Sequence, residues 1–321
     1  MCGISGWIMP EKSQWRPDKK FIKYWFAQIE NRGKDATGYA TLTDESRLFY
    51  MKGAGTASKF VASIDDEDVP VGRIGLLHTR SWTVGPPAKN ENNHPIIVGK
   101  TVVTHNGGMY NIAEAYKALG VETPVAEVDS AIIPHALHAL GYVKGMEFLV
   151  EKVPGIAAIA ALLPDKNLLL ARDSKPLYIG RLPEGGFMWS SEEEPCFGTT
   201  TFDLNKFNFA QAGRFPQGQY VVLNGKTLSV VAMGEFTLKD VPTGAQGNFL
   251  GAGSRMSGGT SGYTIRDHRG SGRSVCAWGR CLAGGVKDAM DTDGRVKKLC
   301  KEHKKKWQRG TAIPKFSDVE R

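Results

Sequence analysis

The chain has 321 residues, 41% of them hydrophobic and 23% charged, which suffices for one domain of about 200–250 residues and a smaller segment. No apolar run of about 18 residues is present, which excludes a predicted membrane-spanning helix. The N-terminus also lacks the basic and apolar regions of a secretory signal. Five cysteines without framework spacing indicate a reducing compartment, so we expect a cytoplasmic protein.

The net charge of +8 is unevenly placed along the chain. Residues 241–321 hold 16 Lys+Arg and 7 Asp+Glu, a balance of +9, whereas residues 1–240 carry a balance of −1. This asymmetry predicts an anionic partner for the C-terminal part rather than for the body of the protein.

The chain opens with Met1 followed directly by Cys2. A small second residue permits removal of Met1, which would leave a thiol and a free α-amine on one residue. The α-amine has an ordinary pKa of about 7.7–8.0, so it can accept the thiol proton. As an alternative, Cys2 is a small apolar residue that opens a buried strand, and a lone cysteine does not decide between the two.

Apolar periodicity then predicts the elements in chain order. A strand over 2–9 is followed by a helix that Asp18 caps and by a hairpin over 39–42 and 48–51. Strands are expected at 74–79 and 96–104, and helices at 112–119 and 129–140. Two further hairpins are expected, one over 156–163 and 168–171 and one over 220–223 and 228–231. Two groups of antiparallel strands with helices between them favour a layered α+β domain that ends near Asp240.

Three polar stretches lie at the ends of these elements. Arg80 at the end of a strand can offer its guanidinium to a carboxylate, or it can form an ordinary surface ion pair. Asn106 and Gly107 at the end of the next strand can place two N–H donors together as in an oxyanion hole, or they can form a simple turn. Asp129 can hold an ammonium group, or it can cap its helix.

Together these stretches resemble one family. The segments that carry the resemblance are Cys2-Gly3-Ile4, Arg32-Gly33-Lys34-Asp35, His78-Thr79-Arg80, Asn93-His94-Pro95 and His105-Asn106-Gly107. Their order is similar to that of class II glutamine amidotransferase domains, and closest to the glutaminase domain of glucosamine-6-phosphate synthase. The resemblance covers residues 2–235 and implies the four-layer αββα sandwich of the N-terminal-nucleophile hydrolases.

The resemblance also implies a role for each site residue. Cys2 would be the nucleophile and its own α-amine the base, with Asn106 and Gly107 as the oxyanion hole. Arg80, assisted by Thr83, would bind the α-carboxylate of L-glutamine, and Asp129 would bind its α-ammonium. The implied chemistry is hydrolysis of glutamine through a glutamyl thioester, for which no cofactor is required.

Two positions depart from the family pattern. The family has tryptophan directly after the arginine, whereas Ser81 stands there and Trp82 follows one residue later. Val84 stands where the family has histidine. These departures bear on ammonia gating and substrate affinity rather than on the class of reaction.

After the amidotransferase domain, taken as 2–240, we expect a Gly/Ser-rich linker over 241–275, a small basic module over 276–310 and a tail over 311–321. The spacing of four ligands in the module is compatible with a structural zinc site, although the cysteines can also be incidental thiols. These ligands are Cys276, Cys281, Cys300 and His303.

The lysine-rich run over 297–307, which includes Trp307, is compatible with nucleic-acid binding or with a solvated helix end. Two function classes follow. One is an enzyme that supplies ammonia to a partner synthetase or transferase, with the acceptor not encoded in this chain. The other is a catalytically silent scaffold whose basic tail binds nucleic acid or a protein. The intact set of site residues favours the enzyme.

Overall fold

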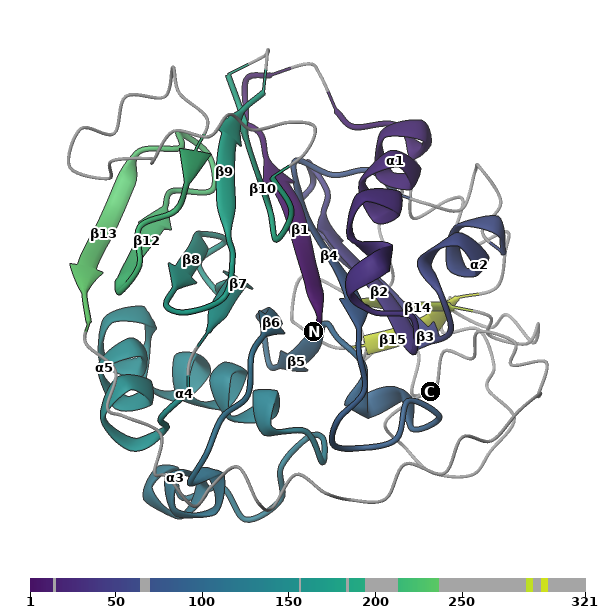
Figure 1. Ribbon diagram of the computed structural model, residues 1–321. Coiled ribbons are helices and arrows are strands. Elements are labelled where there is room, and N and C mark those ends of the chain that lie inside the picture. Colours follow the sequence, from purple (N-terminus) through teal and green to yellow (C-terminus); the bar gives the residue numbers. More distant parts are fainter. Residues whose placement is uncertain are drawn as a thin grey trace, which may run out of the picture.

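The computed structural model describes residues 1–13, 16–63, 70–155, 157–182, 185–193 and 213–236, together with the backbone of 287–290 and 296–299. Within these ranges the chain forms two antiparallel sheets with helices on their outer faces (Figure 1). The α+β fold expected from the sequence is confirmed. None of the described helices is long and apolar enough to cross a membrane.

Sheet A contains the N-terminal strand near its centre. Its described strands lie in the spatial order β11 (Gly213–Arg214), β9 (Tyr178–Arg181), β10 (Phe187–Ser190), β1 (Gly3–Ile8), β4 (Ile74–Arg80), β2 (Ala36–Leu42), β3 (Leu48–Ala54), β14 (Lys287–Met290) and β15 (Val296–Leu299). Helices α1 (Lys19–Ile29) and α2 (Ala57–Ala62) cover its outer face (Figure 1). The α1 helix begins where the Asp18 carboxylate accepts the Phe21 N–H at 2.8 Å, as its sequence predicts.

Sheet B is built mainly from the second half of the chain. Its described strands lie in the order β13 (Val230–Glu235), β12 (Gln219–Leu223), β8 (Leu168–Arg172), β7 (Ala158–Leu162), β6 (Thr101–Asn106) and β5 (Ile96–Val98). Three helices cover its outer face, namely α3 (Ile112–Leu119), α4 (Ile132–Leu140) and α5 (Tyr142–Lys152). Three short 3-10 helices, η1 (Glu30–Arg32), η3 (Asn90–Asn92) and η4 (Asp129–Ala131), lie among the described connections.

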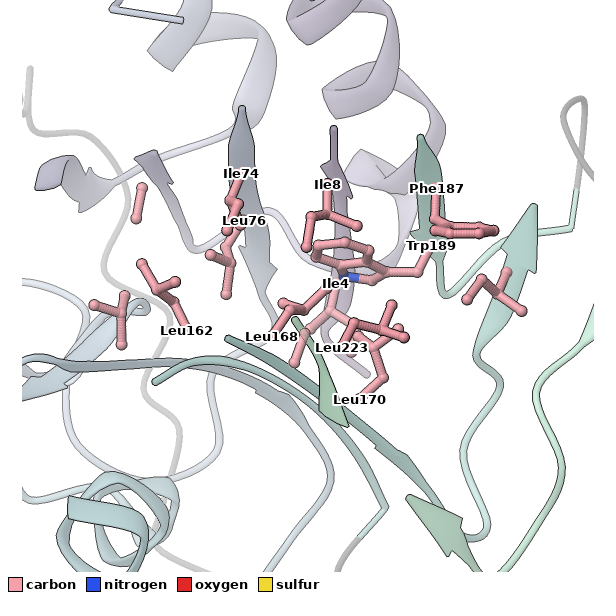
Figure 2. Packing of buried hydrophobic residues seen from close by; sticks show 14 of the residues in the cluster. Ile4, Ile8, Ile74, Leu76, Leu162, Leu168, Leu170, Phe187, Trp189 and Leu223 are labelled. Atoms are coloured by element: carbon pink, nitrogen blue, oxygen red, sulfur yellow. The ribbon is translucent and has the colours of Figure 1, made fainter. Parts of the chain in front are cut away.

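The core consists of three apolar layers, because both faces of each sheet are covered. Successive side chains of a strand point to opposite faces, so Ile4 and Ile8 pack between the sheets while Trp7 packs under α1. In β7, Ala158 packs between the sheets and Ile159 faces the helices of sheet B. Figure 2 shows the inter-sheet layer, in which residues of both sheets interdigitate. The layers therefore run helices, sheet, sheet, helices.

Three expectations about individual elements are corrected. The single strand expected over 96–104 is two strands, β5 and β6, because Gly99 adopts a positive φ of 56° and turns the chain. The helix expected over 129–140 begins as the 3-10 helix η4 and continues as α4. In the last hairpin the second strand begins at Val230 rather than at Leu228, which has a φ of 63°.

Most of the segment after the amidotransferase region lies outside the described residues, including the expected linker over 241–275. The exception is a pair of strands, since β14 pairs antiparallel with β3 and β15 pairs with β14. These strands extend sheet A at its β3 edge. The module over 276–310 and the tail over 311–321 stay predictions.

Candidate active site

The candidate residues lie where strands of both sheets end at the same side of the molecule. Gly3 is opposite Thr79 in the β1–β4 pairing. Cys2, which precedes Gly3, and Arg80, which follows Thr79, therefore lie at one edge of sheet A. In sheet B, β6 ends at Asn106. Strands β1 and β4 both contact β6 across the inter-sheet core, and the N-terminus lies beside the end of β6 in Figure 1. The topology thus brings residues more than 100 positions apart to one place.

The Cys2 thiol is partly buried and held by sheet A. Its Sγ lies 3.7 Å from the Ser81 carbonyl oxygen, and its own carbonyl accepts the Arg32 Nε–H at 3.0 Å. Burial raises the pKa of the Cys2 thiol above its ordinary value, while the Ser81 contact, the N-terminal ammonium and Arg80 lower it. A buried thiol of this kind needs a base beside it before it becomes a nucleophile.

Two glycines in the motif segments are explained by close packing around this thiol. A Cβ on Gly3 would lie 2.6 Å from the Thr79 Oγ1 and 2.8 Å from the Ile29 Cβ. A Cβ on Gly33 would lie 2.3 Å from the Arg80 carbonyl carbon. Only glycine leaves room at these positions, so the segments before and after α1 can lie directly against the site strands.

The Arg80 guanidinium is buried and tied to the loop that follows β4. Its Nη1 donates to the Asn93 Oδ1 at 2.8 Å, and its Nη2 donates to the carbonyls of Val84 and Gly85. Burial lowers the pKa of Arg80, and the nearby Cys2 and Asp129 raise it, which places these groups within electrostatic range of one another.

Asn106 and Gly107, the two expected oxyanion donors, lie at the end of β6 and directly after it. Asn106 is 1% exposed, and its Nδ2 has no hydrogen-bond partner among the described residues. An unsatisfied buried donor costs about 1–3 kcal/mol, which is commonly tolerated where the donor has a ligand to bind. A Cβ on Gly107 would lie 2.4 Å from the Ala157 Cβ, so this position requires glycine.

Asp129 does not cap its helix. The N-cap position of η4 is Val128, and no side chain caps this end. Instead the Asp129 Oδ2 accepts the Met109 N–H at 2.7 Å, and it lies 3.9 Å from the position that a Cβ on Gly108 would take. The carboxylate therefore sits over the loop that follows Asn106, where it can face a bound ammonium group.

Comparisons with known proteins find glutamine amidotransferases among the proteins that this chain resembles. A family profile described as "Glutamine amidotransferase domain" matches residues 80–196. The glutamine–fructose-6-phosphate aminotransferase of Pyrococcus horikoshii is 30% identical over 255 residues, which cover 76% of this chain and 38% of that protein. The corresponding protein of Gluconobacter oxydans is 31% identical over 191 residues, covering 56% of this chain and 30% of that protein. The chain belongs to the class II glutamine amidotransferase family.

Solved structures show the same fold. The glutamine phosphoribosylpyrophosphate amidotransferase from B. subtilis superimposes with a TM-score of 0.54 at 18% identity, over 74% of this chain and 50% of that chain. A structure described as the allosteric regulatory enzyme of purine biosynthesis gives a TM-score of 0.51 at 17% identity, with the same coverage. The chain thus spans half the length of these solved chains and about a third of the length of the curated relatives it matches.

One candidate site residue makes no described hydrogen bond to Arg80, its expected partner. Thr83 is exposed in the loop after β4, and the described contacts of Arg80 do not include it. That loop meets the guanidinium through the carbonyls of Val84 and Gly85 instead. The role expected for Thr83 in binding the substrate carboxylate stays a prediction.

Sequence reasoning assigned no role to three histidines of the motif segments. His78, His94 and His105 are all buried. The His94 ring stacks on that of His78, and His78 contacts the His105 carbonyl, whereas the His105 ring lies on the helix side of sheet B, where it contacts Ser130. Burial lowers the pKa of His78 to about 3 and that of His105 to about 4. All three histidines belong to the motif segments, which is a signal in the sequence that they lie near the site. That they come close together depends on how the two sheets pack.

The expected zinc ligands lie outside the described residues. These are Cys276, Cys281, Cys300 and His303. Within the part of the chain that the structure describes, no group of three or more His, Cys, Asp or Glu side chains could hold a metal ion. The zinc site therefore stays a prediction about the C-terminal segment.

Proposed function

We propose that the amidotransferase domain hydrolyses the side-chain amide of L-glutamine through a thioester on Cys2 and supplies the ammonia to an acceptor. The observation that carries the proposal is the buried Asn106 Nδ2, which has no partner among the described residues and lies at the end of β6, a strand that contacts β1. A donor in that position is suited to an oxyanion that forms only during reaction.

The proposed base forms when Met1 is removed. Met1 is 69% exposed, so an aminopeptidase can reach it. The freed α-amine of Cys2 then accepts the thiol proton, and Sγ forms a bond to the amide carbon of glutamine. The negative charge that develops on the amide oxygen is received by the Asn106 side chain and the Gly107 N–H.

Collapse of this intermediate breaks the carbon–nitrogen bond. The proton held by the α-amine passes to the departing nitrogen, which leaves as ammonia, and a glutamyl thioester remains on Cys2. Water then adds to the thioester, the carbon–sulfur bond breaks, and glutamate leaves with the thiol restored. Neither step calls for a metal or an organic cofactor.

Two opposite charges support glutamine as the substrate. The zwitterionic end of an α-amino acid needs a cation for its carboxylate and an anion for its ammonium. Arg80 and Asp129 are within electrostatic range of each other and of Cys2. We therefore assign Arg80 to the α-carboxylate and Asp129 to the α-ammonium.

The acceptor is proposed to belong to a partner synthetase or transferase. The names of the curated relatives mention both glutamine and fructose 6-phosphate. The name of a solved relative mentions both glutamine and phosphoribosylpyrophosphate. In each case ammonia from glutamine would reach a phosphorylated sugar, which makes that class a first candidate for the acceptor. The basic segment over 297–307 is a candidate contact for a partner or for nucleic acid.

The test begins with the mass of the purified protein, which should lack Met1. The processed protein should release equal amounts of ammonia and glutamate from glutamine, and Cys2→Ser should lose nearly all turnover while keeping its melting temperature. A diazoketone analogue of glutamine should add covalently to Cys2. Retention of Met1, or unchanged turnover in Cys2→Ser, would overturn the proposal. A correctly processed but inactive protein would favour the scaffold alternative.

A further inference from the structure

The buried histidines link the elements that carry the site residues. His78 lies two residues before Arg80 on β4, and His105 lies one residue before Asn106 on β6. His94 lies in the loop after η3, and its ring stacks on that of His78 with centroids 4.1 Å apart and planes 22° apart. The described hydrogen bonds of His78 and His105 are to other residues of the chain, so an effect of these rings on the site would pass through those residues.

One contact joins the two sheets directly. The His78 Nε2 lies 3.0 Å from the His105 carbonyl oxygen. A carbonyl only accepts hydrogen bonds, so Nε2 must carry the proton and His78 is held as one tautomer. This bond connects the end of β4 to the end of β6.

A second contact continues from the His105 ring to the helix start. The His105 Nδ1 lies 2.9 Å from the Ser130 Oγ, and Ser130 is the residue after Asp129. The opposite edge of the ring lies under Gly107, because a Cβ on Gly107 would be 2.6 Å from the His105 Nε2. The ring is therefore held between the loop of the oxyanion donors and the residue that follows Asp129.

We propose that His105 and Ser130 are positioning residues, which hold the oxyanion hole at a set distance from the Asp129 carboxylate. The inference rests on the proposed function, since it concerns how that site is kept in register. Misplacing a catalytic group by about 1 Å can cost on the order of 100-fold in rate. Without the Ser130 hydroxyl, one edge of the imidazole ring lacks its hydrogen bond, and the loop resting on the ring is no longer fixed.

The experiment compares Ser130→Ala with Ser5→Ala. Ser5 is a matched control because it is buried like Ser130 and its hydroxyl donates to the Trp189 carbonyl at 2.8 Å. Both variants lose one buried side-chain hydrogen bond, so their melting temperatures should fall by similar amounts. Only Ser130→Ala should lower kcat for glutamine, by about tenfold or more, with KM changed less than about threefold.

Two inhibitors separate positioning from general damage. Glutamate γ-semialdehyde adds the Cys2 thiol across its aldehyde, forming a carbon–sulfur bond and placing the oxygen in the oxyanion hole. Its inhibition constant should rise in Ser130→Ala by about the factor lost in kcat, since both report the same geometry. Inhibition by glutamate, which needs no oxyanion hole, should change little. Equal behaviour of Ser130→Ala and Ser5→Ala in all these measurements would overturn the inference.

A further variant and a spectroscopic measurement cover the case in which Ser130→Ala does not fold. Ser130→Thr keeps the hydroxyl and should retain most of kcat. In the wild-type protein, nitrogen NMR should find the His105 ring in one tautomer between pH 5 and pH 8, and an ordinary titration of the ring in that range would contradict the inference. If the processed wild type releases no ammonia, the proposed function itself fails; if it is active while Ser130→Ala is unimpaired, only the positioning role fails.

Discussion

The two sheets contribute to the site in different ways. On the sheet A side, Arg80 donates to Asn93 and to two loop carbonyls, and the Cys2 carbonyl is bound by Arg32. On the sheet B side, the Asn106 Nδ2 has no partner among the described residues, and Asp129 accepts one backbone N–H. One side of the site is hydrogen-bonded before any ligand arrives, whereas the other side keeps a buried donor unsatisfied.

This difference indicates where binding and chemistry are separated. Groups that are bonded in the resting protein contribute to its stability as well as to ligand binding. A buried donor without a partner lowers stability and can gain its hydrogen bond only when an oxyanion forms. Substitutions on the two sides should therefore affect stability and turnover in opposite proportions.

The largest contrast is expected between two buried asparagines. Asn106→Ala should lower kcat by about 100- to 1,000-fold, because it removes an oxyanion donor, yet it should leave the melting temperature nearly unchanged. Asn93→Ala removes the acceptor of Arg80 and the donor to the Pro87 carbonyl, both at 2.8 Å. It should lower the free energy of unfolding by about 2 kcal/mol or more. Thermal unfolding and kinetics on both variants measure this, and a larger loss of stability in Asn106→Ala would contradict the comparison.

The histidine cluster between the two sides should make folding sensitive to acid. Burial holds the pKa of His78 at about 3 and that of His105 at about 4, and that of His94 well below its ordinary value. Arg80 and Lys52 beside them lower the pKa of His78 and His94 further. Unfolded histidines have a pKa of about 6.5, so between about pH 6.5 and 4 the unfolded chain binds more protons than the folded one.

The contribution of these histidines to the free energy of unfolding is therefore fully present above about pH 6.5. It is lost progressively as the pH falls below that value. Each of the three histidines should contribute about 1.4 kcal/mol per pH unit in this window. Urea unfolding at pH 7, 6 and 5 measures how steeply the free energy of unfolding depends on pH. His94→Phe should reduce this slope by about 1.4 kcal/mol per pH unit, which corresponds to one proton. His138→Gln, at an exposed position, is the control and should leave the slope unchanged. An equal slope in wild type and His94→Phe would show that His94 is already protonated in the fold.

On the sheet A side, Arg80→Lys should raise KM for glutamine by about tenfold or more. A lysine ammonium cannot bond Asn93 and the loop carbonyls as a planar guanidinium does and also meet a carboxylate. The free energy of unfolding should fall while KM rises, since the resting hydrogen bonds of Arg80 are lost as well. Arg181→Lys, on the exposed end of β9, is the control and should change neither quantity. A variant that keeps the wild-type KM would remove Arg80 from substrate binding.

On the sheet B side, Asp129→Asn keeps an oxygen that can accept the Met109 N–H but removes the charge. The variant should fold normally and should bind glutamine about tenfold more weakly, as expected for the loss of one buried charge contact. An analogue of glutamine without the α-amine should be affected much less. Equal losses with both substrates would show that Asp129 acts only by holding the loop.

The smallest effect is expected from the ion pair behind Cys2. Arg32 and Glu192 meet at 2.8 Å, but the Glu192 side chain is 39% exposed. Because exposed ion pairs contribute about 0–1 kcal/mol, Glu192→Gln should leave turnover within about twofold of wild type. Arg32→Gln, which also removes the bond to the Cys2 carbonyl, is the informative partner variant. A large loss in Glu192→Gln would show that the pair is needed to orient Arg32.

Local patterns in the sequence account for much of the fold. The Asp18 cap of α1 was predicted and is observed, and the strand predicted over 2–9 is observed as Gly3–Ile8. These features depend on neighbours a few residues apart, so periodicity and capping reveal them. The predicted strand over 96–104 was wrong because one glycine with a positive φ reverses an otherwise continuous apolar run.

By itself the sequence determined the family and named the groups that a glutamine site would need, because motif segments are read locally. It could not show that Asp129 binds the Met109 N–H rather than capping its helix, or that the Asn106 amide is buried without a described partner. Nor could it show that His78 bonds the carbonyl of His105 across two sheets. Such relations join residues far apart in the chain, and burial and pairing at that range exist only once the two sheets have packed together.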